Sequence, residues 1–150
     1  MESMKNLLAL VMFHKHNIHM LHWNLCGDEF QSNHEYMGEL YGEMEDHIDS
    51  IAEMYIQEGG TPLTYKEMID YLMADNADHT CVSSSILYDK TKAFTLAIQM
   101  FNEIIAAIDA CYSDDSVPRA HQSELETMQA WYMLRAKYLM PRRLTQASAE

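Results

Sequence analysis

The sequence predicts an all-α protein, a bundle of four long helices with a short extra helix between the second and the third. Glycine and proline are scarce, with five and three among 150 residues, whereas 48% of the residues are hydrophobic and 13 are methionine. This composition favours helices over a turn-rich β fold. Apolar residues also recur three and four positions apart along four long stretches, which is the period of one helix face. A chain of this length is expected to form a single domain, residues 1–150.

The first two helices are expected at about Glu2–Leu25 and from Ser32 to the pair Gly59-Gly60. Gly27 is a plausible stop for the first helix. Ser32 and Glu35 have the spacing of a capping box at the start of the second. The apolar face of the second helix would consist of Met37, Tyr41, Met44, Ile48, Ile51 and Tyr55.

Thr64 and Glu67 form a second capping-box pattern, which opens a short helix through about Met73. The third long helix is expected over His79–Tyr112, and the fourth over Arg119–Met140, where Pro141 would end it. The apolar positions of the third helix include Ile86, Phe94, Ile98, Phe101, Ile105 and Ile108.

Charge and cysteine usage limit the class of protein. The net charge of −13 should repel nucleic acid and attract cations, although an acidic soluble surface explains it equally well. The three cysteines, Cys26, Cys81 and Cys111, form no C-x-x-C motif, which fits a reducing cytoplasm. The apolar run NLLALVMF is too short for a membrane span and has no cleavage site after it. We therefore expect a cytoplasmic protein with no membrane segment.

Four polar residues on the first two helices are candidate metal ligands: His22, His34, Asp49 and Glu53. Each of them alone is more simply a surface residue. Asp49 and Glu53 are four residues apart, so they share a helix face. Two like charges at this spacing destabilise a helix by ~0.2–0.5 kcal/mol. A cation bound between them would remove that penalty.

The spacing of these residues requires a second chain. His34 and Asp49 are 15 residues apart, which is roughly 22 Å along a helix, too far to hold one metal ion. If a second copy packs antiparallel along this helix, His34 of one chain faces Asp49 and Glu53 of the other. Each dimer would then hold two equivalent sites, with His22 joining from the first helix. Mixed imidazole and carboxylate ligands suit iron, manganese or zinc.

The segment HWNLCGDEFQSNHEYMGELYGEMEDHIDSIAEMYIQEGGTPL resembles the Dps proteins (DNA protection during starvation) of the ferritin superfamily. The family pattern is His-Trp-Asn, then His, Asp four later, Asp eleven further on, and Glu four beyond. His22, His34, Asp49 and Glu53 fall at matching positions. The segment ETMQAWYMLRA of the last helix is similar to the family as well. The resemblance implies a ferritin-like bundle that assembles, through antiparallel dimers, into a hollow shell of twelve subunits.

The resemblance also implies a chemistry. Family members oxidise iron(II), usually with hydrogen peroxide, at the site between subunits, and store the ferric product inside the shell. His22 and His34 would be nitrogen ligands, Asp49 a terminal carboxylate, and Glu53 the carboxylate that bridges two non-haem iron ions. Zinc or manganese would be substitutes for iron. Trp23, next to the site, would serve packing or act as a sink for oxidising equivalents.

One position departs from the family pattern, because Gly38 stands where the family has Asp. A glycine cannot bind metal, so the second metal position and fast ferroxidase activity are in question. Gly38 and Gly42 are one turn apart and could instead let a partner helix approach closely. A non-catalytic shell, or a bundle that acts only as an interaction protein, therefore remain alternatives to an iron-oxidising enzyme.

DNA binding is not expected from this sequence. Family members that bind DNA commonly use lysine-rich tails, whereas the start MESMKNLLAL has one lysine and the end PRRLTQASAE has two arginines. Two further groups of residues have open interpretations. His14, His16 and His19 could form a metal-rich patch or be ordinary core and surface residues. Asp114 and Asp115 could line an acidic pore or simply lie in a polar loop.

Overall fold

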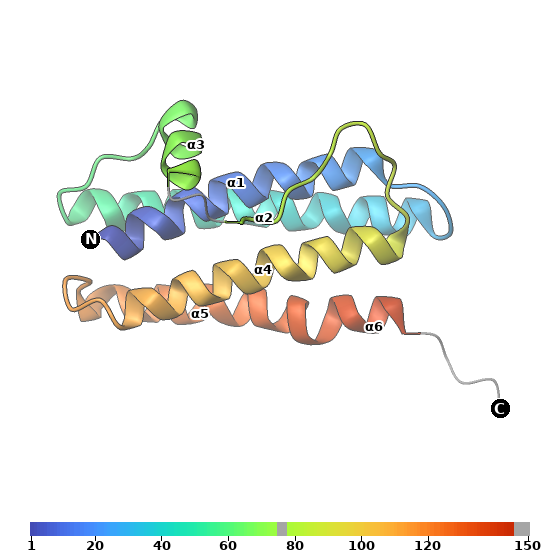
Figure 1. Ribbon diagram of the computed structural model, residues 1–150. Coiled ribbons are helices and arrows are strands. Elements are labelled where there is room, and N and C mark those ends of the chain that lie inside the picture. The colour runs from blue at the N-terminus through green and yellow to red at the C-terminus, as the bar shows by residue number, and fades with distance from the viewer. Residues whose placement is uncertain (75–77, 146–150) are drawn as a thin grey trace.

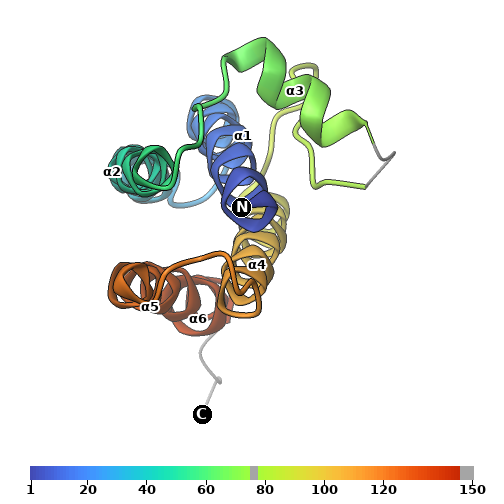
Figure 2. The ribbon, with the colours of Figure 1, turned by 90° about the vertical axis from the view of Figure 1, so that its left-hand side faces the viewer.

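The computed structural model describes residues 1–74 and 78–145 and confirms the all-helical prediction, since this part of the chain contains no strand. Its long helices are α1 (Glu2–Asn24), α2 (Phe30–Gln57), α4 (Lys90–Tyr112) and α5 (Gln122–Leu134). The short helix α3 (Tyr65–Met73) crosses the outside of the bundle against α1 (Figure 2). Helices α1 and α2 form one pair and α4 and α5 the other (Figure 1). The predicted four-helix architecture with a short insertion is therefore confirmed.

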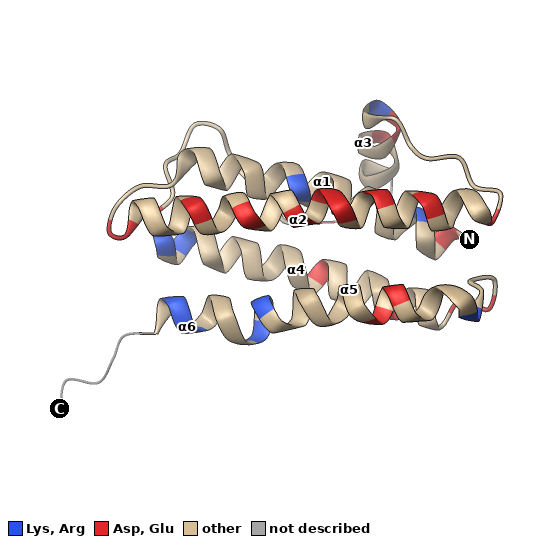
Figure 3. Cartoon of the chain, turned by 180° about the vertical axis from the view of Figure 1, so that it is seen from behind, with Lys and Arg blue, Asp and Glu red and all other residues tan. Residues whose placement is uncertain are grey.

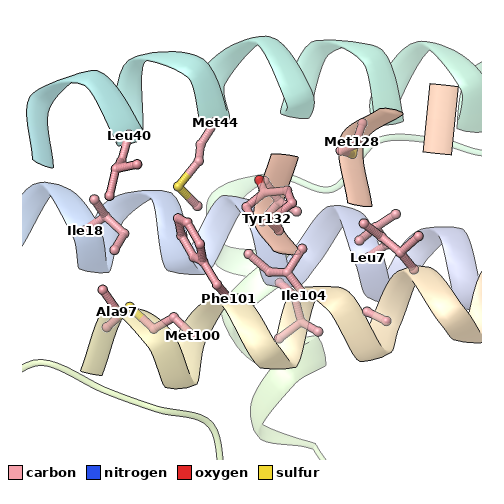
Figure 4. Close-up of a cluster of buried hydrophobic side chains, with 14 of the residues drawn as sticks. Leu7, Ile18, Leu40, Met44, Ala97, Met100, Phe101, Ile104, Met128 and Tyr132 are labelled. Carbon is pink, nitrogen blue, oxygen red and sulfur yellow. The ribbon is translucent and has the colours of Figure 1, made fainter. Parts of the chain in front are cut away.

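The core lies between these two pairs, where all four long helices contribute apolar side chains (Figure 4). Leu7 and Ile18 come from α1, Phe101 from α4 and Tyr132 from α5. All four of these side chains are completely buried. The apolar face predicted for the second helix is confirmed, with Met37, Met44 and Ile51 fully buried and Tyr41, Ile48 and Tyr55 partly buried.

Helix α4 has a mean hydropathy of 1.4 over an 18-residue window, so it is long and apolar enough to span a membrane by length and composition. Within the described residues it is the one helix that meets this test. Its apolar side chains pack in the bundle, where 44% of that window is buried. The core of the bundle therefore accounts for its composition.

The predicted start of α3 is confirmed and that of α2 is wrong by two residues. Thr64 Oγ1 accepts the backbone N–H of Glu67, and the Glu67 carboxylate accepts the N–H of Thr64, so the capping box is complete. Helix α2 begins at Phe30 instead, after Glu29 in a left-handed conformation (φ 61°). Ser32 is then already inside the helix, so it cannot cap it.

The predicted start of the third long helix at His79 is also wrong, because α4 begins at Lys90. Asp89 caps it by accepting the N–H of Lys92 at 2.9 Å. Before Asp89 the chain pairs with the end of α1 through hydrogen bonds from Tyr88 N to Asn24 O and from Cys26 N to Tyr88 O. Ile86, expected in the core, is 46% exposed. The local apolar pattern predicted a helix here, but the segment before Asp89 instead forms hydrogen bonds with the distant end of α1.

The connection before α4 is attached to the bundle through Glu103 of α4. One carboxylate oxygen lies 3.0 Å from His79 Nδ1 and 3.2 Å from His14 Nε2, and the other accepts the N–H of Thr80 at 3.0 Å. Hydrogen bonds from His14 and Thr80 outweigh the effect of burial and lower the pKa of Glu103 to about 2. Glu103 is therefore an anion at neutral pH that joins α1, α4 and the connection.

The fourth long helix does not end before Pro141 as predicted. A short 3₁₀ turn, Arg119–His121, leads into α5, and a π-helical turn, Arg135–Leu139, leads from α5 into α6 (Met140–Leu144). A proline removes one backbone N–H, and its ring clashes with the carbonyl four residues earlier, here that of Lys137. Lys137 lies inside the π turn, whose wider backbone accommodates the proline without ending the helix.

Candidate metal centre

His22 and His34 are held together where the last turn of α1 meets the first turns of α2. His22 Nδ1 lies 2.6 Å from the backbone oxygen of His34, and His34 Nδ1 lies 2.8 Å from the backbone oxygen of His22. Their rings stack with centroids 3.7 Å apart and planes at 18°. The sequence predicts both histidines as ligands of one site, and the structure brings their rings into contact.

These hydrogen bonds fix which ring nitrogen is available to a metal. A backbone carbonyl can only accept, so each Nδ1 carries the proton and donates it. In the neutral rings both Nε2 atoms therefore keep a free lone pair. Metal-binding histidines typically donate their other ring N–H to a carbonyl or carboxylate in this way. The pair His22 and His34 thus fits two nitrogen ligands of a metal ion.

Aromatic rings enclose this pair. Phe30 stacks on His34 at 5.2 Å, and Tyr41 meets the edge of His22 at 5.3 Å. His19 stacks on Tyr41 with ring centroids 4.0 Å apart, and it contacts the exposed Trp23 in a tilted arrangement with centroids 3.9 Å apart. Burial, together with the nearby His22, lowers the pKa of His19. These stacked rings leave the two histidines little freedom to rotate.

The alternative patch of His14, His16 and His19 does not form. His14 is completely buried and bonds Glu103 and Asn17, whereas His16 is exposed. His14 is therefore a core residue.

Asp49 and Glu53 lie far from the histidine pair along α2, and both are exposed. Figure 3 shows that acidic residues follow α2 along the face seen from behind. Among the described residues of one chain, no three His, Cys, Asp or Glu side chains are grouped so that they could hold a metal ion. A single chain therefore joins the two imidazoles and leaves the two carboxylates apart, as the spacing argument requires.

Gly38 lies against the ring of His22. A Cβ atom at this position would lie 3.3 Å from His22 Cε1 and 3.5 Å from Nδ1. A Cβ on Gly42 would meet nothing within 4 Å in its own chain. Position 38 is thus beside the candidate site, and the close packing there comes from the chain's own histidine. The surface at Gly42 is open to another molecule.

We predict that Gly38→Asp loosens the site. The new Cβ would require the His22 ring to shift by a few tenths of an ångström, although its hydrogen bond to His34 and its stacking on that ring hold it in place. Overpacking of this kind costs about 1–3 kcal/mol, more than the few tenths of a kcal/mol of helix propensity that Asp gains over Gly. Thermal unfolding and peroxide-driven iron oxidation would both be measured. A variant that is more stable and also faster would show that Gly38 is simply a lost ligand.

The structure also reveals polar groups that the sequence analysis missed. His47 of α2 bonds the hydroxyl of the buried Tyr132 at 2.8 Å, and desolvation lowers the pKa of His47. These two residues are 85 positions apart, so no local pattern could indicate their contact. A cavity of about 300 Å³ lies beside them between α2 and α5, lined by His47, Ser50, Ser123, Glu124, Thr127, Met128 and Trp131. It does not include the histidine pair.

The loop that contains Asp114 has a structural explanation. Hydrogen bonds from Ser116 and from Ser3 of α1 lower the pKa of Asp114. Asp114 thus orders the turn and connects it to the start of α1. Asp115 is exposed, and its place in a pore remains a prediction.

A protein-family model described as "Ferritin-like domain" matches residues 1–113. The "DNA protection during starvation protein" of Listeria innocua is 36% identical over 64 residues, which cover 42% of this chain and 41% of that protein. The "DNA protection during starvation protein 2" of Bacillus anthracis is 43% identical over 61 residues, 40% of each chain. The chain thus spans well under half the length of these curated relatives.

Two solved structures share the fold over nearly the whole chain. The crystal structure of a Dps protein from Bacillus brevis has a TM-score of 0.78 at 21% identity, and covers 95% of this chain and 93% of that one. The crystal structure of Helicobacter cinaedi CAIP has a TM-score of 0.65 at 20% identity, with 96% and 98% covered. At such identities the likeness concerns the arrangement of helices.

Proposed function

The chain belongs to the ferritin-like family, in its Dps-like branch, and from this premise we propose that it binds, oxidises and stores iron. The oxidant would be hydrogen peroxide, and the site would lie between two chains of an antiparallel dimer. One observation carries the proposal: His22 and His34 donate their Nδ1–H groups to each other's backbone and present two unprotonated Nε2 atoms. The protein would be cytoplasmic and form a closed shell, as a dodecamer.

Each site would combine His22 and His34 of one chain with Asp49 and Glu53 of the partner subunit. Two imidazoles and two carboxylates suit iron(II), with zinc and manganese as substitutes. The carboxylates stabilise the ferric state because they place negative charge beside the ion. Two iron(II) ions each give one electron to one peroxide, whose O–O bond breaks to leave two hydroxide ions. Trp23 contacts the ring of His19, which in turn contacts the ring of His22. Trp23 would accept stray oxidising equivalents.

A second candidate function is a shell that binds metal without efficient oxidation. Gly38 favours it, because this position lies beside His22 and supplies no carboxylate. The site would then bind one metal ion tightly. Glu53 would be the one carboxylate that could bridge this ion to a second metal ion. Iron oxidation would be slow, while binding would persist.

An anaerobic iron titration followed by peroxide tests both functions. We expect iron(II) to bind stoichiometrically, ferric absorbance to rise on adding peroxide, and light scattering to report an assembly larger than a monomer. Binding without a rise in ferric absorbance would support the non-catalytic shell. A stable monomer at micromolar concentration, or absence of iron binding, would contradict both functions and favour an interaction protein.

We predict that the protein does not retard plasmid DNA at physiological salt. The net charge of −13 is multiplied in an assembly, and polyanions repel one another. The segment before α1 is Met1 alone in this sequence, α1 itself begins at Glu2, and residues 146–150 lie outside the described part. A gel-shift titration measures this, with calf histone as a positive control. A retarded band that weakens steeply as salt rises would show that a local basic patch overrides the net charge.

A further inference from the structure

The orientation of His79, which lies on the connection before α4, is fixed by Glu103. Its Nδ1 lies 3.0 Å from the Glu103 carboxylate. Because an ionised carboxylate can only accept, Nδ1 carries the proton and donates it. The other ring nitrogen, Nε2, is then an unprotonated acceptor in the neutral ring. In the described part of the chain, no hydrogen bond to Nε2 of His79 is formed.

Glu103 is itself held in place from two other directions. Thr80 donates its backbone N–H to one oxygen at 3.0 Å, and His14 donates from Nε2 to the other at 3.2 Å. His14 must use Nε2 as its donor, because its Nδ1 accepts the amide of Asn17. The carboxylate therefore cannot turn away from His79. A histidine whose second nitrogen bonds a fixed carboxylate is the arrangement found in metal sites.

A cavity of about 360 Å³ opens beside His79, between α1, α4 and the connection before α4. Its polar lining residues are Asn6, Asp78, His79 and Glu103. The remaining wall is formed by small and apolar side chains: Leu10, Ala106, Ala107 and Ala110. Since one liquid water occupies about 30 Å³, a cation with several water ligands would fit in this space.

We propose that this cavity is a second divalent-cation site, with His79 Nε2, the Asp78 carboxylate and the Asn6 amide oxygen as its ligands. One nitrogen and two oxygen donors, with water completing the shell, suit zinc, iron(II) or manganese. All ligands come from one chain, so this site does not require a dimer. Asp78 and His79 adjoin in sequence and lie on the connection, and Glu103 is a positioning residue.

The competing explanation is that His79 only attaches the connection to the bundle. His79→Gln distinguishes this explanation from a metal site. A glutamine amide can still donate a hydrogen bond to Glu103 but has no imidazole nitrogen that could bind a metal ion. Asp78→Asn removes a charged ligand and leaves Glu103 and its partners untouched. Glu103→Gln keeps every proposed ligand and removes the negative charge that orients His79, a charge that also bonds His14 and Thr80.

Equilibrium dialysis of the assembled protein with Zn²⁺ tests the proposal. We expect the wild type to bind two classes of zinc, one removed by His34→Ala and the other by His79→Gln. Loss of an orienting partner typically weakens metal affinity about 10- to 100-fold, so Glu103→Gln should weaken the second class by that factor. X-ray absorption of the zinc bound to His34→Ala should show one imidazole among oxygen ligands.

Unchanged zinc binding by both His79→Gln and Asp78→Asn would overturn this proposal. If His79→Gln fails to fold, as circular dichroism would show, Asp78→Asn alone decides by whether the second class weakens. Failure of the intersubunit site would look different, because His34→Ala would then bind as much zinc as the wild type. The two proposals therefore fail through different variants.

Discussion

A mixture of two inactive variants should recover iron binding. His34→Ala alone, or Asp49→Ala with Glu53→Ala, is expected to abolish tight iron binding and to leave the fold intact, because these side chains contribute little to the core. In a heterodimer of the two variants, one interface site has all its native ligands and the other lacks His34, Asp49 and Glu53. Half of the wild-type sites per dimer should therefore bind iron.

The measurement is iron binding by verified heterodimers, made with two different purification tags and isolated by both. Each homodimeric variant is the control. Glu126→Ala, an exposed glutamate of α5, is the matched substitution and should bind iron as the wild type does. Verified heterodimers that bind no iron would refute the antiparallel arrangement. A site built from one chain cannot be rescued in this way, because each variant chain lacks some of the ligands.

The second large effect is expected from Glu103→Gln, which should lower the free energy of unfolding at pH 7 by about 2 kcal/mol. Hydrogen bonds to a charged group contribute about 1.5–3 kcal/mol each, but the carboxylate is 24% exposed and solvent weakens them. Because His14 is completely buried, the loss of its charged partner cannot be compensated by water. Urea denaturation of the metal-free protein measures this difference.

The difference should also disappear in acid. The folded pKa of Glu103 is about 2, below its usual value of 4.5, so the carboxylate stabilises the fold fully above pH 4.5. This stabilisation is lost as the pH falls from 4.5 towards 2. The wild type should therefore approach the stability of Glu103→Gln over that interval, while Glu126→Gln stays near the wild type throughout. An unchanged difference between the two proteins at pH 7 and pH 2.5 would contradict the assignment.

Local patterns were enough for much of the fold. The capping box of Thr64 and Glu67 joins residues three apart, so short-range chemistry determines where α3 starts. The apolar period likewise placed Met37, Met44 and Ile51 in the core. The predicted helix ends that were wrong depended on contacts with a distant segment or on a change in the backbone geometry. Thr80 bonds Glu103 of α4 rather than beginning a helix, and a π turn keeps the helix going through Pro141.

The candidate site divides in the same way. The separation of His34 from Asp49 along one helix is fixed by the rise per residue, so the need for a second chain follows from the sequence itself. Which nitrogen of His22 faces a metal depends instead on the backbone carbonyl of His34, and the fold alone brings these atoms to 2.6 Å. Glu103 and His79, 24 residues apart, meet for the same reason. Spacing along a helix is set by covalent geometry, whereas the protonation and direction of a side chain are set by its neighbours in space.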